Sequence, residues 1–330
     1  MSAKKIFFIL NLHIYKKNVI IHGKKGDIMR TVSFSNYTFK KFEKLKLESS
    51  IFNTEGKLYR FTDKNKWDLS EKVLKVFYNT EGDIFSNKLF TINSLIDNSD
   101  LIDIDEIVLP DKLAIVNSKV CGYTMPFIRG INLNLILKDF SISNEFKISL
   151  LKQISEILKK MDNLRKNSEL KDFFINDLHE GNFIYNTDTR KLNVVDTDSF
   201  KINDNKPFAA KYLTPASSIV NIPKKYIQNI ELRYPGFIVS NKNSDLYCFN
   251  IIILNYLFQN NVSKLSMENF YTYLNYLRTI GLPYRLVDKF AKLYEYLDNE
   301  NIFEELDYIT DSVLEKSNAL AFHNATKKKV

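Results

Sequence analysis

The chain has 330 residues, a formal net charge of +8 and two cysteines. The positive charge lies at the ends, because residues 1–28 contribute +5 and the basic tail at residues 323–330 contributes +3, so a basic groove for nucleic acid is not expected. The longest apolar run, around residues 251–258, is too short to span a bilayer, and Cys121 and Cys248 lie in apolar settings, which favours reduced thiols in a cytoplasmic protein.

Residues 1–28 are interpreted as a non-native or disordered N-terminal extension. The segment Lys24-Lys25-Gly26-Asp27-Ile28 could be encoded by a purine-rich stretch with GGAG just before an ATG codon, as at a bacterial ribosome-binding site. We therefore expect translation to start at Met29. The alternative is that residues 1–28 form a basic hairpin on the lobe that follows.

Two strands are predicted next, at residues 57–61 and 72–77, with the turn Thr54-Glu55-Gly56 before the first. The second strand carries Lys75 between apolar neighbours. Residues 85–96 then show the apolar spacing of a helix, and this segment contains no Glu.

The next elements are a strand with its turn and a long helix. Residues 122–133 predict the strand and turn, and they include Met125, Pro126 and Ile128. Pro126 has no backbone N–H and can offer only its carbonyl to a partner. Apolar positions recurring between residues 148 and 161 predict an amphipathic helix that serves structure rather than chemistry.

The most informative segment places three polar side chains close together. Asp177 and Asn182 lie five residues apart across a turn that contains glycine, and residues 183–185 follow as a short buried strand. Residues 192–195 predict the partner strand of a hairpin, which brings Asp196 beside Asn182. Carboxylate and amide oxygens of this kind suit Mg²⁺. The alternative is a solvated turn in a chain rich in Asn and Asp.

Beyond this hairpin the sequence predicts a polar segment followed by helices. The polar segment covers residues 199–218. Helices are expected at residues 244–258, 270–277 and 286–297, and residues 306–314 are expected to close the fold.

These motifs resemble the catalytic and metal-binding loops of the protein kinase-like superfamily, which includes protein kinases, aminoglycoside phosphotransferases and choline kinases. The resemblance implies an α+β, bilobal protein kinase-like fold. A small β-rich N-lobe would cover residues 29–125, and a hinge with a larger α-helical C-lobe would cover residues 126–322. It also implies ATP and Mg²⁺ as cofactors, with a protein or a small hydroxylated molecule as the acceptor.

The resemblance assigns a role to each matching residue. Asp177 would be the base that orients the acceptor hydroxyl, and Asn182 and Asp196 would be the metal ligands. Lys75 would bind the nucleotide phosphates, and Gly56 would belong to the nucleotide loop. The alternative for Lys75 is a surface lysine whose ammonium reaches water.

Adenine would be held by the segment that joins the two lobes. Met125 would stand at the gatekeeper position, Pro126 would offer its carbonyl and Ile128 its amide. The alternative is an ordinary strand and turn with Met125 in a core.

Two further residues give conflicting signals about the branch of the superfamily. His179 stands where protein kinases carry a Lys near the γ-phosphate, and in this the loop resembles aminoglycoside and choline kinases. Asp245, in Ser244-Asp245-Leu246-Tyr247-Cys248-Phe249, resembles the anchor of protein kinases that accepts hydrogen bonds from the catalytic-loop backbone. Its alternative is an ordinary helix N-cap. A protein serine/threonine kinase is favoured on this pattern.

The chain also departs from the family pattern. Gly56 is the only glycine kept in the nucleotide loop. Residues 85–96 contain no Glu that could pair with Lys75, and Glu81 could take the place of this missing Glu. Ile175-Asn176 replaces His-Arg, and Thr197-Asp198 replaces the Phe-Gly that follows the metal Asp. A pseudokinase, meaning a nucleotide-binding scaffold without turnover, is therefore the competing interpretation.

Overall fold

The computed structural model describes much of the chain between Arg30 and Asn318. The described residues are 30–45, 55–65, 68–205, 232–234, 237–238, 242–259, 262, 265, 267–295 and 301–318. The extension at residues 1–28, the start at Met29, the tail at 323–330 and most of the segment 199–218 lie outside them.

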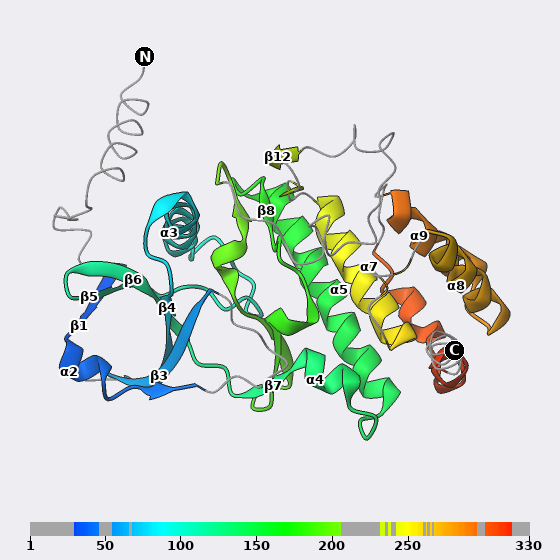
Figure 1. The fold of residues 1–330 in the computed structure, drawn as a ribbon, viewed down its shortest axis with the longest axis horizontal. Helices are drawn as coiled ribbons and strands as arrows, with labels where there is room; N and C mark the ends of the chain where they lie inside the picture. The colour runs from blue at the N-terminus through cyan, green and yellow to red at the C-terminus, as the bar shows by residue number, and fades with distance from the viewer. Residues whose placement is uncertain are drawn as a thin grey trace, which may run out of the picture. The chain divides into compact units, whose positions relative to one another are not determined.

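The chain divides into two compact units. Unit 1 comprises the residues up to Asp100 together with Val108–Phe127, and unit 2 comprises Leu101–Ile107 together with the chain from Ile128. Unit 1 contains the largest sheet of the described chain, and unit 2 contains small sheets and long helices (Figure 1). The described chain therefore belongs to the α+β class.

The assignment of residues 101–107 to unit 2 differs from the lobe boundaries expected from the sequence, which placed residues 29–125 together. The backbone gives the reason. The Val194 N–H donates to the Glu106 carbonyl at 2.7 Å, and Ile107 forms a parallel bridge with Val194. These bonds join the segment to the hairpin of unit 2.

Unit 1 is built on a six-stranded sheet in the order β1-β5-β6-β4-β3-β2. β1 is parallel to β5, and the other neighbouring strands are antiparallel. The strands are β1 (Thr31–Phe34), β2 (Glu43–Lys44), β3 (Gly56–Asn65), β4 (Asp68–Phe77), β5 (Lys112–Val116) and β6 (Lys119–Pro126). The two strands expected at residues 57–61 and 72–77 are present and extend further than the sequence suggested.

The core of unit 1 is rich in aromatic residues. Phe34, Leu74 and Ala114 form its buried centre. The rings of Phe42 and Phe61 stack beside it with their centroids 4.7 Å apart. The short helix α2 (Asn36–Phe39), capped by Ser35, lies between β1 and β2 in the chain.

Helix α3 (Gly82–Asp97) confirms the helix expected at residues 85–96. It buries apolar residues at helical spacing, namely Phe85, Leu89, Ile92 and Leu95. Lys88 lies on this buried face as well. An apolar stripe interrupted by one lysine is unusual, because a lysine side chain is rarely buried unless its ammonium is paired.

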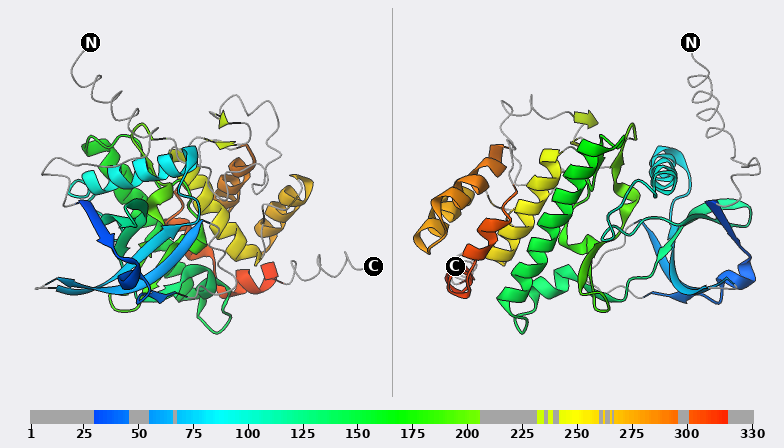
Figure 2. Two further views of the ribbon diagram at one scale, coloured as in Figure 1. Left: turned by 60° about the vertical axis from the view of Figure 1, so that its left-hand side comes forward. Right: turned by 180° about the vertical axis from the view of Figure 1, so that it is seen from behind.

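Unit 2 is organised around two long helices that lie side by side, α5 (Asn144–Asn167) and α7 (Lys242–Phe258), as both views in Figure 2 show. The apolar stripe expected between residues 148 and 161 is buried on α5. α7 is buried on every side between Ser244 and Leu254. The remaining helical elements are α4 (Leu133–Lys138), α8 (Met267–Thr279), α9 (Tyr284–Glu295), η5 (Glu304–Tyr308) and a helix at residues 311–318.

The small sheets of unit 2 carry its loops. The predicted hairpin is present, with β9 (Phe183–Asn186) antiparallel to β10 (Lys191–Val194) and to β7 (Gly130–Asn132). The short strand β8 (Phe173–Phe174) precedes the hairpin in the chain, β11 (Lys201–Ile202) follows it, and these two strands pair with each other. The other small elements are β12 (Leu232–Tyr234), β13 (Phe237–Ile238), η2 (Glu180–Asn182) and η3 (Thr197–Ser199).

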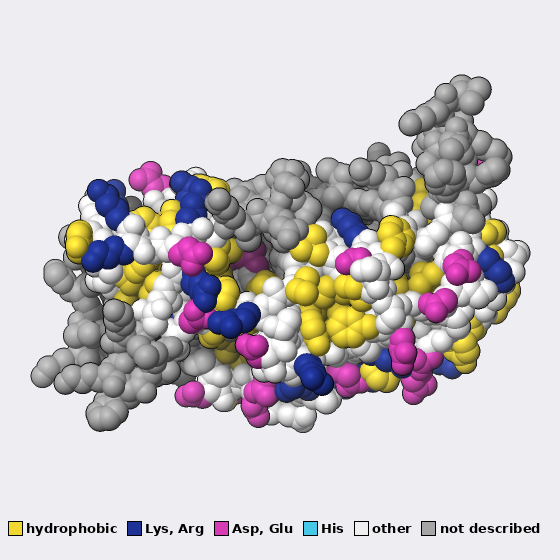
Figure 3. All heavy atoms as spheres, turned by 90° about the horizontal axis from the view of Figure 1, so that it is seen from below, with side chains coloured by type: hydrophobic (Ala, Val, Ile, Leu, Met, Phe, Trp, Pro, Cys, Tyr) yellow, Lys and Arg dark blue, Asp and Glu magenta, His cyan; other side chains and the backbone are white. Residues whose placement is uncertain are grey.

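The described surface is mixed in charge on the face drawn in Figure 3, where acidic and basic side chains are interspersed around a gathering of apolar ones. Exposed apolar side chains of unit 2 include Ile131 and Phe140. None of the helices in the described part of the chain has the length and apolarity needed to cross a membrane.

Candidate active site

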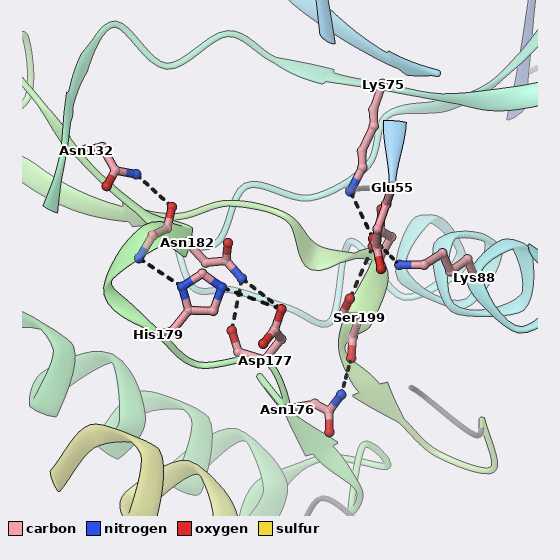
Figure 4. A network of polar contacts seen from close by, with 11 residues as sticks. Glu55, Lys75, Lys88, Asn132, Asn176, Asp177, His179, Asn182 and Ser199 are labelled. Carbon is pink, nitrogen blue, oxygen red and sulfur yellow. Dashed lines mark hydrogen bonds and ion pairs between the residues drawn. The ribbon is translucent and has the colours of Figure 1, made fainter. Parts of the chain in front are cut away.

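In unit 2, the loop between β8 and β9 brings Asp177 and Asn182 into contact. The Asn182 Nδ2 group donates to the Asp177 carbonyl at 3.0 Å and lies 3.4 Å from its Oδ2 (Figure 4). Asn182 is buried at the end of η2. Because its NH₂ group faces Asp177, the amide oxygen of Asn182 points away from that carboxylate.

His179 lies beside the same carboxylate. Its Nδ1 accepts a hydrogen bond from the Gly181 N–H at 3.0 Å, and its Nε2 lies 3.7 Å from Asp177 Oδ2. An accepting Nδ1 places the proton of the neutral ring on Nε2, the nitrogen that faces Asp177. Gly181 permits this arrangement, because a Cβ there would lie 2.7 Å from His179 Cε1. Asn132 donates to the Gly181 carbonyl at 2.7 Å and so ties the loop to the end of β7.

The hairpin delivers Asp196 next to this loop. The Val195 N–H donates to the Asn182 carbonyl at 2.9 Å, so Asp196 follows immediately after a residue bonded to Asn182. Asp196 has the left-handed conformation, with φ 62° and ψ 46°. This conformation costs about 1–2 kcal/mol for most residues, and Asp tolerates it better than most. An unusual backbone conformation at a carboxylate makes Asp196 a candidate for a functional role.

Asn182 and Asp196 offer oxygen donors of the kind that Mg²⁺ binds. Among the described residues, no three His, Cys, Asp or Glu side chains come together as a metal-binding group. Mg²⁺ is usually held by one or two carboxylates, with water and substrate phosphates as its other ligands. The Asn182 amide oxygen and the Asp196 carboxylate fit such a partial set. Asp198, two residues further on, is buried and accepts from the Ser199 hydroxyl at 3.3 Å.

Asp245 lies under the loop. Its two carboxylate oxygens accept from the Ile175 N–H at 3.0 Å and the Asn176 N–H at 3.1 Å. Asn176 has a positive φ of 62°, and its side chain donates to the Ser199 carbonyl at 2.9 Å. Because α7 already begins at Lys242, Asp245 is within its first turn and not at the N-cap. The carboxylate therefore holds the backbone just before Asp177.

The buried setting of Asp245 makes a pH-dependent prediction. Burial raises the pKa of its carboxyl from 3.8 to about 6, against the opposing effect of the Ile175 and Asn176 N–H groups and Arg165. The folded state therefore binds this proton more tightly than the unfolded chain. The stability that the protonated group provides is complete below about pH 4 and is lost as the pH rises through about 6.

We expect the wild type to lose roughly 2–3 kcal/mol of unfolding free energy, relative to Asp245→Asn, between about pH 4 and pH 7. Urea denaturation of both proteins across this range measures the difference. A difference in unfolding free energy between the two proteins that does not change with pH would show that Asp245 does not titrate in this way.

In unit 1, Lys75 is buried on β4. Its side chain is 2% exposed, and its Nζ lies 3.8 Å from Glu55 Oε2 and 5.5 Å from the centre of the Phe77 ring. The ammonium group is thus buried and does not extend to water. The acidic neighbour is Glu55 of the turn before β3, whereas Glu81 is exposed at the start of α3.

Two glycines set the spacing of the strands around Lys75. A Cβ at Gly56 would lie 2.5 Å from the Val76 carbonyl oxygen, and a Cβ at Gly122 would lie 1.7 Å from the Lys75 carbonyl oxygen. Both distances are impossible for real side chains. Glycine on the neighbouring strands β3 and β6 therefore allows the backbone to approach β4 closely.

The residues expected to contact adenine are placed along the connection between the units. Met125 is buried on β6 opposite Val73, and Pro126 ends that strand with its side chain exposed. The Phe127 N–H donates to the Glu71 carbonyl at 3.0 Å, and the half-buried Ile128 is the first residue of the second part of unit 2. Met125 and Pro126 are thus on the strand that pairs with the strand of Lys75.

The residues singled out by the sequence therefore form two groups, one in each unit. Asp177, His179 and Asn182 lie together in unit 2, with Asp196 adjoining them in the chain next to Val195. Lys75 and Gly56 belong to unit 1 with Met125 and Pro126. The sequence reasoning missed the roles of Glu55, Lys88, Gly122 and Asn132. Two of these could have been noticed in the sequence: Gly122 as a glycine within a predicted strand, and Lys88 as a lysine on the apolar face of a predicted helix.

Comparison with known proteins gives no relative from which a function could be taken: no family model matches the chain, and no curated protein matches it. The argument for function therefore rests on the arrangement of these side chains.

Proposed function

We propose that the chain is an ATP- and Mg²⁺-dependent phosphotransferase with a bilobal, protein kinase-like fold. In this proposal unit 1 is the N-lobe and unit 2 is the C-lobe. The observation that carries it is the loop of unit 2, where Asp177 and Asn182 are in contact and the following hairpin bonds to Asn182 just before Asp196. A solvated turn would have no reason to hold Asp177 against Asn182 next to backbone that a buried carboxylate, Asp245, binds.

The chemistry asks mainly for positioning and charge neutralisation. Asp177 accepts the proton of the acceptor hydroxyl and orients that hydroxyl for attack. Asn182 Nδ2 at 3.4 Å and His179 Nε2 at 3.7 Å both lie near its Oδ2 and help to position it. Asn182 and Asp196 are the residues that would hold Mg²⁺, and the ion would supply charge neutralisation for the nucleotide phosphates. Lys75 contacts the α- and β-phosphates, and the Pro126 carbonyl and Ile128 amide bind adenine beside Met125.

The acceptor is proposed to be a serine or threonine hydroxyl of a protein. The pattern from Ser244 to Phe249 favours this branch, because the buried Asp245 binds the loop backbone as an anchor would. The Asp-Leu-His-x-Gly-Asn string that begins at Asp177 is the argument for a small hydroxylated molecule instead.

One observation favours a second candidate, a nucleotide-binding pseudokinase scaffold. Helix α3 contains no glutamate, and the side chain that it directs toward the Glu55 carboxylate, the neighbour of Lys75, is Lys88. In an active kinase of the usual kind, a glutamate from this helix pairs with the phosphate-binding lysine. The two candidates differ in turnover, since only the enzyme transfers phosphate.

The test is transfer of ³²P from the γ-position of ATP with Mg²⁺, by wild type and by Asp196→Ala. The acceptors are the protein itself, generic protein substrates and aminoglycosides. We expect label on protein that is lost in the variant, because Asp196 supplies the charged metal ligand. Asp188→Asn, a matched change on the exposed turn of the same hairpin, should transfer like wild type.

The other outcomes each select a different function. Label on an aminoglycoside would move the protein to the small-molecule branch. An absence of transfer to every acceptor, together with a thermal shift caused by ATP, would leave the pseudokinase scaffold. Transfer that survives in Asp196→Ala would exclude the proposed metal ligand.

A further inference from the structure

Two buried lysines of unit 1 converge on one carboxylate. Lys88 Nζ lies 2.7 Å and Lys75 Nζ 3.8 Å from the same oxygen, Glu55 Oε2 (Figure 4). The lysine side chains are 7% and 2% exposed, whereas that of Glu55 is 41% exposed. The two cations are therefore buried, whereas the anion is partly exposed to water.

Such an arrangement is costly without an anion. Each ammonium loses its hydration on burial, and the two like charges repel each other. Lysine stems are long enough to carry their charges to water, yet both ammonium groups stay buried. Two different elements, β4 and α3, thus present positive charge to the same carboxylate oxygen.

The backbone of Glu55 is fixed independently of its side chain. The Glu55 carbonyl accepts from the Tyr78 N–H at 2.9 Å, and the next residue, Gly56, pairs with Phe77 in the sheet. Because the side chain is 41% exposed, its carboxylate has a route into water while the turn stays in place. Displacement of this anion therefore requires no change in the sheet.

We propose that Lys75 and Lys88 together form a phosphate-binding seat, and that the phosphates of a bound nucleotide displace the Glu55 carboxylate from both. The inference rests on the proposed function and adds to it Lys88 as a binding residue and Glu55 as an internal competitor. A phosphate chain carries more charge and more acceptor oxygens than one carboxylate, so it satisfies two ammonium groups better. Lys88 then adds a second positive charge at the phosphates, at the place where the usual kinase has a helix glutamate paired with its lysine.

The alternative is that Glu55 and Lys88 form a structural ion pair that fastens α3 to the turn before β3. The two interpretations predict effects of opposite sign for Glu55→Gln. If Glu55 competes with phosphate, removing its charge tightens phosphate binding. If Glu55 instead positions the lysines, removing its charge weakens phosphate binding.

The experiment is calorimetric titration of the full chain with ATP and Mg²⁺, with adenosine, and with inorganic tripolyphosphate as a probe without a base. We expect Lys88→Gln to weaken ATP and tripolyphosphate binding about tenfold, as the loss of one charged hydrogen bond implies, with adenosine unchanged. Glu55→Gln should tighten ATP and tripolyphosphate binding about threefold or more, again with adenosine unchanged.

A matched control is Lys72→Gln. Lys72 lies on the same strand as Lys75, three residues earlier, and pairs with Asp111 at 3.1 Å. Because side chains on a strand alternate between faces, Lys72 and Lys75 point to opposite faces of the sheet. Its replacement should leave the affinity for all three ligands as in wild type.

Several results would overturn the inference. A folded Lys88→Gln protein with unchanged ATP affinity would show that Lys88 has only a structural role. Weaker ATP binding by Glu55→Gln would show that Glu55 positions the lysines and does not compete with phosphate. If Lys88→Gln does not fold, the sign of the Glu55→Gln effect decides alone. Tripolyphosphate binding that Lys88→Gln weakens, without adenosine or ATP binding, would keep the phosphate-binding seat and reject the kinase. A wild type that binds none of the three ligands would reject both.

Discussion

Replacing Asp177 by Asn is expected to lower phosphoryl transfer by about 10²- to 10⁴-fold without weakening nucleotide binding. The substitution keeps the shape of the side chain and removes its charge and basicity. In the proposed mechanism Asp177 acts on the acceptor hydroxyl, whereas Lys75, Asn182 and Asp196 contact the phosphates and the metal. The loss should therefore appear in turnover, with little change in the affinity for ATP.

The measurement is single-turnover transfer of labelled phosphate, alongside calorimetric titration with ATP on the same preparation. Asp188→Asn on the exposed turn between β9 and β10 serves as the control, since it makes the same chemical change outside the loop. A pseudokinase would show equal and negligible turnover in all three proteins. Turnover of Asp177→Asn close to that of an active wild type would remove Asp177 from the mechanism.

The elements with strong local signals could be predicted from the sequence. The hairpin follows from two short apolar strands on either side of a polar turn, and its observed register pairs Phe183 with Val194. The stripe of α5 follows from the spacing of its apolar residues. In each case the residues that determine the element are near neighbours in the chain, so the pattern is visible without knowledge of the fold.

Contacts between distant residues could not be predicted in this way. The bond between Asn132 and the Gly181 carbonyl spans 49 residues, and the pair of Glu55 with Lys88 spans 33. Chain order does not show that the turn before β3 faces α3, so the sequence offered Glu81, just before the expected helix, as the acidic partner of Lys75. The segment 101–107 joins unit 2 for a similar reason, because its bonds are made with Val194, far along the chain.

The left-handed conformations of Asn176 and Asp196 were also hidden in the sequence. Asn and Asp adopt this conformation more readily than other residues with side chains, but most Asn and Asp residues do not adopt it. In this structure both residues flank the segment that contains Asp177 and Asn182. Their conformation follows from bonds on either side, such as that of the Asn176 N–H to Asp245.

The largest loss of stability is expected from Gly122→Ala, which adds one methyl group between two strands. A Cβ at this position would lie 1.7 Å from the Lys75 carbonyl oxygen and 2.8 Å from its carbonyl carbon. Both are backbone atoms of β4, so no side-chain rotation can relieve the clash. The pairing of β6 with β4 must open locally, and we expect a cost of about 3 kcal/mol or more.

The matched control for this change is Gly82→Ala, in the same unit. A Cβ at Gly82 would meet nothing within 4 Å, and only the positive φ of 82° opposes the substitution, which should cost about 1 kcal/mol. Denaturant unfolding of both variants measures the two costs. Because the clash falls on the backbone that carries Lys75, Gly122→Ala should also weaken tripolyphosphate binding, whereas Gly82→Ala should not. Equal stability of the two variants would mean that β6 does not approach β4 as closely as the 1.7 Å contact at Gly122 implies.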